Sequence, residues 1–172
     1  MSRRWITLAT ASLLLAACAK PETAEQMQAR MNTESAAAKT AITSMAHDYG
    51  VHMSAGHVYT VLTYFTSDAV VLPPNHAAVS GLEAIGTWMR GDPMPPGSSL
   101  TITTVDVAAN GPLAVERGTY AFTMPAMGRN PAVNVTGKYL NHLHMVDGKW
   151  KIAAQIWSDD TPAMPMPTAP RS

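Results

Sequence analysis

Apolar residues recur every three or four positions through the first half of the chain, a spacing that predicts helices. The pattern is carried by three groups: Ala38, Ile42, Met45, Tyr49 and Met53; Val58, Val61, Leu62 and Phe65; and Leu82, Ile85 and Met89. Before the third group, Ser80 and Glu83 have the spacing of a capping box, with Ser80 as N-cap. A short apolar run over residues 69–72, ended by Pro73 and Pro74, predicts a strand.

The second half of the chain alternates between apolar and polar residues with the two-residue period of strands. The predicted strands are Leu100–Ala108, Leu113–Met124, Val133–Val146 and Trp150–Asp159. Asn110-Gly111 and Asp147-Gly148 separate neighbouring runs, and both dipeptides are strong hairpin-turn signals. Helices followed by an antiparallel meander predict an α+β fold, with three helices packed on one face of a bent antiparallel sheet.

The first residues have the features of an export signal. Arg3 and Arg4 precede an apolar run, 6–17, that is too short to span a bilayer as a mature helix. The run ends in Leu-Ala-Ala-Cys, with Cys18 last, which resembles the lipobox of bacterial lipoproteins. The resemblance implies lipidation of Cys18 and cleavage before it, which would anchor the chain in a membrane. In the enterobacterial lipoproteins that this segment resembles, an Asp after the cysteine retains the protein in the inner membrane. The resemblance with Ala19 at that position therefore implies the outer membrane, facing the periplasm.

The composition indicates a single folded domain. The chain has 172 residues, of which 47% are hydrophobic and 14% charged, and this excludes wholesale disorder. Twelve basic and twelve acidic residues cancel, so charge gives no case for nucleic acid. The single cysteine excludes a disulfide framework. The predicted organisation is a signal peptide (1–17), a lipidated cysteine and tether that turns helical toward the domain (18–35), a domain (36–160) and a Pro-rich tail (161–172).

Four segments together resemble the SnoaL-like branch of the nuclear transport factor 2-like superfamily. They are FTSDAVVLPPN at 65–75, GLEAI at 81–85, GKYL at 137–140 and GKWKIA at 148–153. The resemblance implies a cone: a strongly bent sheet wrapped around helices, with a pocket at the open end. Its members include isomerases, dehydratases, polyketide cyclases, epoxide hydrolases and association domains, so the function has to be argued from the site.

Isomerase chemistry in such a fold needs a carboxylate base in an apolar pocket and a tyrosine or protonated acid that donates to an oxyanion. Asp106 shares a strand face with Ile102, and Glu116 shares one with Tyr120 and Phe122. We therefore take Asp106 and Glu116 as the candidate bases. The alternative is that each is a rim or solvent residue.

Two tyrosines are candidates for a pocket wall. Tyr120 alternates with Phe122, and Tyr139 alternates with Asn141. If these faces look into the cone, they place hydroxyl and amide groups in an apolar wall, which suits a small, mostly apolar ligand. The alternative is that both tyrosines are core residues with satisfied hydroxyl groups.

A tryptophan and two histidines are candidates for an interface. Trp157 alternates with the polar residues Lys151, Gln155 and Asp159 on its strand, and this predicts that they share a covered outer face. We therefore expect a two-fold homodimer that uses Trp157, His142 and His144. The spacing of His142 and His144 also permits joint metal binding. No acidic or thiolate ligand stands nearby in the sequence, so we expect no metal.

The sequence shows no phosphate-binding Gly-rich loop and no serine nucleophile elbow, so no cofactor is expected. The favoured prediction is a lipid-anchored domain that binds a small apolar molecule. One alternative is an isomerase, dehydratase or cyclase, in which Asp106 or Glu116 acts with Tyr120 or Tyr139. The other is a non-catalytic association module whose pocket is filled by side chains.

Overall fold

The computed structural model describes residues 21–128 and 131–160. The predicted signal peptide, Cys18 and the Pro-rich tail lie outside these residues. The elements, in chain order, are α1 (Ala24–Ser54), α2 (Val58–Leu62), β1 (Phe65–Leu72), β2 (Val79–Ser80), α3 (Leu82–Gly91), β3 (Ser99–Asn110), β4 (Leu113–Met124), β5 (Val133–Val146) and β6 (Lys149–Asp159). None of the helices in the described part of the chain is long and apolar enough to cross a membrane.

The six strands form one sheet in the order β2-β1-β6-β5-β4-β3. The four long strands pair antiparallel as predicted, through the two hairpins. The sheet as a whole is mixed, however, because β1 pairs parallel with β6, where Val71 lies opposite Gln155. The sequence predicted the antiparallel meander, which is confirmed, but it did not predict this parallel pair. Residue alternation identifies a strand, but it does not give the direction of a partner far away in the chain.

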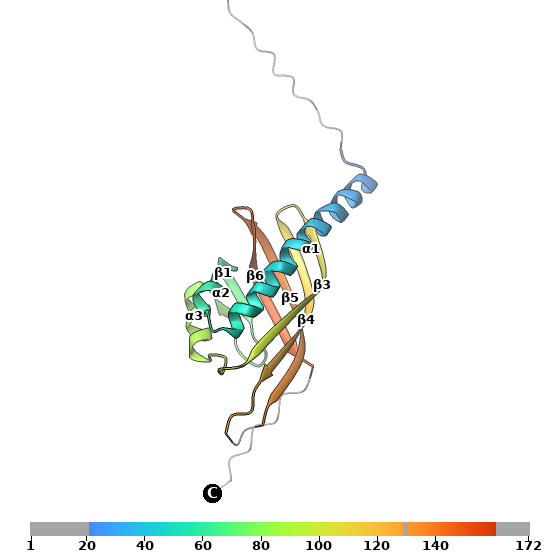
Figure 1. The fold of residues 1–172 in the computed structure, drawn as a ribbon. Helices are drawn as coiled ribbons and strands as arrows, with labels where there is room; N and C mark the ends of the chain where they lie inside the picture. The colour runs from blue at the N-terminus through green and yellow to red at the C-terminus, as the bar shows by residue number, and fades with distance from the viewer. Residues whose placement is uncertain (1–20, 129–130, 161–172) are drawn as a thin grey trace, which may run out of the picture.

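Helix α1 is longer than the sequence predicted, and it includes most of the predicted tether. A capping box starts it, because the Thr23 side chain accepts from the backbone N–H of Gln26 and the Gln26 side chain accepts from that of Thr23. Farther along, the backbone N–H of Ala109 in β3 donates to Ser35 Oγ at 2.9 Å. Near the end of the helix, Gly50 lies against the Leu100 carbonyl, where a Cβ atom would stand only 2.7 Å from the oxygen. The helix therefore packs along β3, as Figure 1 shows.

The second and third helices differ from their predicted ends. Helix α2 stops at Leu62, and Phe65 begins β1 instead of ending the helix. The N-cap of α3 is Gly81, with φ of +85°, and no side chain caps the helix. The predicted capping box of Ser80 and Glu83 was therefore wrong, because Ser80 belongs to β2 and pairs with Val70.

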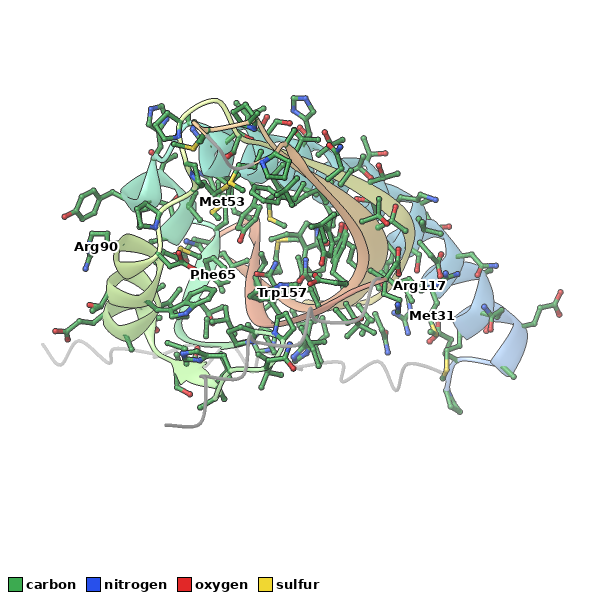
Figure 2. The ribbon with its side chains drawn as sticks, turned by 90° about the horizontal axis from the view of Figure 1, so that it is seen from below. Met31, Met53, Phe65, Arg90, Arg117 and Trp157 are labelled. Atoms are coloured by element: carbon green, nitrogen blue, oxygen red, sulfur yellow. The ribbon has the colours of Figure 1, made fainter. Side chains whose placement is uncertain are left out.

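The sheet curls around the helices, and the strands form an arc in Figure 2. The core lies on the inner face of this arc. Its largest fully buried apolar side chains are Phe65, Ile42, Ile85, Leu143, Ile152, Val61 and Val71. Two bulges interrupt the register of the antiparallel pairs, one in β3 between Thr104 and Asp106 and one in β6 opposite His142 and Leu143. The parallel pair of β1 and β6 is also irregular, between Phe65 and Val70. Each bulge shifts the alternation by one residue, so the side chains beyond it change faces.

Candidate functional site

A cavity of about 290 Å³ lies inside the cone, between the second half of α1, α3 and the inner face of the sheet. Its walls are mostly apolar, and the interior is not filled by side chains. The lining residues are Met45, Ala46, Tyr49, Met53, Trp88, Met89, Leu100, Ile102, Tyr120, Phe122, Val135, Tyr139, Asn141, Ile152, Gln155, Trp157 and Asp159. Met53 and Trp157 are labelled in Figure 2. A concave, mostly apolar site with few polar groups is typical of a small-molecule site.

Two glycines on the inner face make room for the two tyrosines of the wall. Tyr139 in β5 lies opposite Gly118 in β4, and a Cβ atom on Gly118 would stand 2.6 Å from the Tyr139 hydroxyl oxygen. Tyr120 lies opposite Gly137, where a Cβ atom would meet the Tyr120 ring at 2.3 Å. Each ring therefore lies across a glycine of the neighbouring strand, and side chains at these positions would push the tyrosines into the cavity.

Behind the wall lies a buried carboxylate, Glu116, which has no exposed surface (0%). Its Oε1 accepts hydrogen bonds from the hydroxyls of Thr104 and Tyr139, each at 2.7 Å. Its Oε2 accepts one from Asn141 Nδ2 at 3.0 Å. Three donors on β3 and β5 therefore converge on one carboxylate of β4, which satisfies a buried anion without a basic side chain.

This network holds two of the polar side chains that line the cavity, Tyr139 and Asn141. Burial, and then the Glu116 charge, raise the pKa of Tyr139, so its hydroxyl stays protonated and donates to Glu116. Glu116 itself is not among the residues that line the cavity, whereas its partners Tyr139 and Asn141 are. The carboxylate therefore lies behind these two side chains. One polar atom of this group is left over: Asn141 Oδ1 is buried and has no hydrogen-bond donor among the described residues.

A second carboxylate, Asp159, does line the cavity. It is exposed and accepts a hydrogen bond from the Tyr120 hydroxyl, so it marks the opening. Burial, and then this bond, raise the pKa of Tyr120. The sequence interpretation placed Asp159 on an outer face and missed its contact with the cavity. The available signal was the two-residue spacing of Gln155, Trp157 and Asp159, which places all three on one face of the strand. In the structure that face lines the cavity.

The predicted pocket residues Tyr120, Phe122, Tyr139 and Asn141 all line the cavity. Their role in binding a ligand stays a prediction. The candidate base Asp106 is not near them, because the bulge in β3 turns it to the outer face, where its Oδ2 lies 3.4 Å from Arg117 Nε. The interpretation that Asp106 shares a face with Ile102 was therefore wrong.

The predicted orientation of Trp157 was also wrong. Trp157 lies opposite Tyr139 on the inner face, and its ring centroid is 6.0 Å from that of Trp88 in α3. The bulge in β6 breaks the alternation that had grouped Trp157 with Lys151. His142 does lie on the outer face, opposite Val115 and Ala154, and its ring contacts that of His144 at 4.6 Å between centroids.

The arrangement is suited to enclosing a ligand more than to transferring a proton deep in the cone. Glu116 accepts from three donors and is separated from the cavity, so it cannot reach a bound molecule in this geometry. The carboxylate with access to the cavity is Asp159, at the opening.

These features define a class: a cone-shaped α+β domain with an internal cavity. A family model described as the SnoaL-like domain matches residues 34–155, so the chain belongs to the SnoaL-like domain family. This family, with the nuclear transport factor 2-like fold, comprises ligand-binding and isomerase- or dehydratase-type proteins. Among curated protein sequences, none matches the chain.

Solved structures share the fold at low sequence identity. A provisionally named scytalone dehydratase from Novosphingobium aromaticivorans has a TM-score of 0.68 at 19% identity, covering 77% of this chain and 89% of that one. A nuclear transport factor 2-like protein with a cystatin-like fold from the same organism gives 0.63 at 12%, covering 83% and 93%. A ketosteroid isomerase-like protein from Erwinia carotovora gives 0.60 at 16%, covering 71% and 96%. At these identities, the likeness shows the fold alone.

Proposed function

We propose that this domain binds a small, mostly apolar molecule inside the cone. The observation that carries the proposal is the cavity of about 290 Å³, which is open and lined by aromatic and aliphatic side chains. A filled cone would have favoured the association module instead. The hydroxyl protons of Tyr120 and Tyr139 are donated to protein carboxylates, so the wall is pre-organised without a ligand.

The test is to fill the cavity. Val135 lines it, and Thr136 beside it points to the outer face of the same strand. The full chain is titrated with the neutral fluorescent probe N-phenyl-1-naphthylamine. We expect Val135→Trp to weaken probe binding about ten-fold or more, while Thr136→Trp, the matched control, leaves it unchanged. Equal binding by both variants and the unsubstituted chain would show that the probe does not use the cavity.

The second candidate function is an isomerase- or dehydratase-type enzyme. Asp159 favours it, because this carboxylate lines the cavity and accepts from Tyr120. Two of the structural neighbours have names of such enzymes. In this reading Asp159 takes the place of Asp106 as the base. Asp159→Asn would then abolish turnover of any substrate found while leaving binding of the naphthylamine probe intact. If the substituted chain turned over as fast as the original, Asp159 would not be the base.

We also propose a homodimer formed by the outer face of the sheet. Apolar side chains there stay 42–48% exposed, which is unusual for a continuous sheet face. They are Val105, Leu113, Val115, Leu140 and Ile156. His142 and His144 lie on the same face, whereas Trp157 is excluded from the interface by its inward orientation. A two-fold axis would let each copy cover the other's apolar side chains.

Sedimentation of the full chain tests the proposed homodimer. A mass of two chains is expected, and a single-chain mass at all concentrations contradicts the dimer.

Finally, we propose that the chain is an outer-membrane lipoprotein facing the periplasm, anchored through Cys18. The support is the charged start, the apolar run and the Leu-Ala-Ala-Cys sequence. Cys18→Ser should release the protein from the membrane fraction and abolish incorporation of labelled palmitate. Cys18→Ser protein that still carries label and sediments with membranes would contradict anchoring at this residue.

A further inference from the structure

Two carboxamide side chains lie next to each other in the wall of the cavity. Asn141 in β5 and Gln155 in β6 are paired across the strands, and both line the cavity. They are 4% and 8% exposed, so both are buried. Polar groups in a mostly apolar wall fix where the polar atom of a ligand can lie. The hydrogen bonds that these two amides already make therefore show what the wall can still offer.

The contact with Glu116 fixes the orientation of the Asn141 amide. Its Nδ2 donates to Glu116 Oε2 at 3.0 Å. The reverse orientation would place Oδ1 against the carboxylate, with two acceptors facing each other. Oδ1 is consequently turned away from Glu116, where no donor of the described residues reaches it. A buried acceptor without a donor destabilises the fold, and a donor brought by a ligand would offset that cost.

Gln155 supplies the complementary group. Its Oε1 accepts from the Tyr49 hydroxyl at 3.4 Å, so the amide oxygen is engaged while the amide also carries two N–H donors. The pair therefore combines an acceptor without a donor, from Asn141, with donors from Gln155. Because an alcohol or phenol hydroxyl both donates and accepts, one hydroxyl matches both amides. A ketone or ether oxygen only accepts, and would leave Asn141 Oδ1 unsatisfied.

We propose that Asn141 and Gln155 form a hydroxyl-recognition subsite, and that the ligand of the cavity is an apolar molecule that carries an alcohol or phenol group. This inference rests on the proposed binding function and narrows its ligand class. The aromatic wall, which includes Trp157 (Figure 2), would contact the apolar body of the ligand, and the amides would select for its hydroxyl. The tyrosines do not compete for this role, because Tyr120 and Tyr139 donate to Asp159 and Glu116.

Three matched probes test the subsite on the full chain by titration calorimetry. 4-Ethylphenol carries the hydroxyl, 4-ethyltoluene has a methyl group in its place, and 4-ethylanisole has an oxygen that only accepts. We expect 4-ethylphenol to bind about ten-fold or more tightly than either of the others. Equal affinities would overturn the subsite and leave the proposed binding function standing. If none of the three binds, the subsite is overturned, and the naphthylamine probe decides whether the binding function falls with it.

Substitutions then locate the preference. Gln155→Leu keeps the three donors of Glu116. It should weaken the binding of 4-ethylphenol about three- to ten-fold without weakening the binding of 4-ethyltoluene. Asn141→Leu should remove the preference altogether, provided that circular dichroism shows it folded. The matched control is Phe122→Leu, an apolar change in the same wall, which should alter both affinities by the same factor. A preference that survives both amide substitutions would overturn the assignment to Asn141 and Gln155.

Discussion

Acidic side chains on the inner and outer faces of the sheet differ in burial and in the number of hydrogen-bond partners. On the inner face, the carboxylate of Glu116 is fully buried and accepts from three donors. On the outer face, Asp106 is exposed and has one contact, with Arg117 at 3.4 Å. Both residues were candidate bases in the sequence, and they lie near each other on neighbouring strands. A single bulged residue between Thr104 and Asp106 turns Asp106 to the outer face, whereas the uninterrupted alternation of β4 keeps Glu116 on the inner face.

The apolar side chains of the two faces differ in the same direction. Those of the inner face enclose a cavity, whereas Leu140 and Ile156 of the outer face stay exposed side by side on β5 and β6. The inner face is therefore completed by the chain's own helices, and the outer face lacks such a cover within the described residues. This difference favours a ligand on one side of the sheet and a second copy on the other.

The largest expected effect compares the two acids directly. Glu116→Ala removes the acceptor for Thr104, Tyr139 and Asn141 and leaves a void, so the free energy of unfolding should fall by about 3 kcal/mol or more. Asp106→Ala should change it by about 0.5 kcal/mol or less, because exposed ion pairs contribute little. Urea unfolding of both variants measures the difference. If the two variants lost similar amounts of unfolding free energy, the buried network around Glu116 would contribute no more to stability than the exposed ion pair of Asp106.

The second prediction concerns the outer face. Leu140→Lys places a charge among the exposed apolar side chains, and should raise the dimer dissociation constant about thirty-fold, equivalent to about 2 kcal/mol. Because Leu140 is already 44% exposed, the monomer should lose little stability. Sedimentation at several concentrations measures the constant. Val51→Lys, at an exposed residue of α1, is the control and should leave it unchanged; equal effects of both would argue against this face as the interface.

The sequence predicted the four long strands to within two residues at their ends, because alternation and the two hairpin dipeptides are local signals. It also grouped Tyr120, Tyr139 and Asn141 in one wall. It failed for Asp106 and Trp157, and for the same physical reason in both cases. Each lies beyond a bulge, and a bulge depends on how two strands pair, which alternation within one strand does not reveal.

Two further failures came from contacts between distant segments. Phe65 has the spacing of a helix residue, but it pairs with Ile152 of β6, and burial in the sheet outweighs the local preference. The buried network around Glu116 joins Thr104, Tyr139 and Asn141 from two other strands. Each of these residues was visible in the sequence, but their convergence on one carboxylate follows only from the strand register.

The smallest expected effect is a change with pH in the stability that the hydrogen bonds of the inner face provide. Burial and the Glu116 charge raise the pKa of Tyr139 above its ordinary value of 10.0. The unfolded chain therefore loses this proton first, and the stability linked to it, complete below about pH 10, declines as the pH rises further. Tyr139→Phe should cost about 1 kcal/mol at neutral pH through the lost hydrogen bond, and this cost should shrink at alkaline pH. Urea unfolding at about pH 8 and about pH 11 measures the change.

The control for this last prediction comes from the same carboxylate. Thr104→Val removes another hydroxyl that donates to Glu116 Oε1 at 2.7 Å, but it removes no group that titrates in this range. Its cost should therefore be similar at both pH values, while that of Tyr139→Phe falls. If the two variants respond to pH in the same way, the alkaline response comes from the network as a whole. If only Tyr139→Phe responds, the response of the inner face depends on the proton that Tyr139 donates to Glu116.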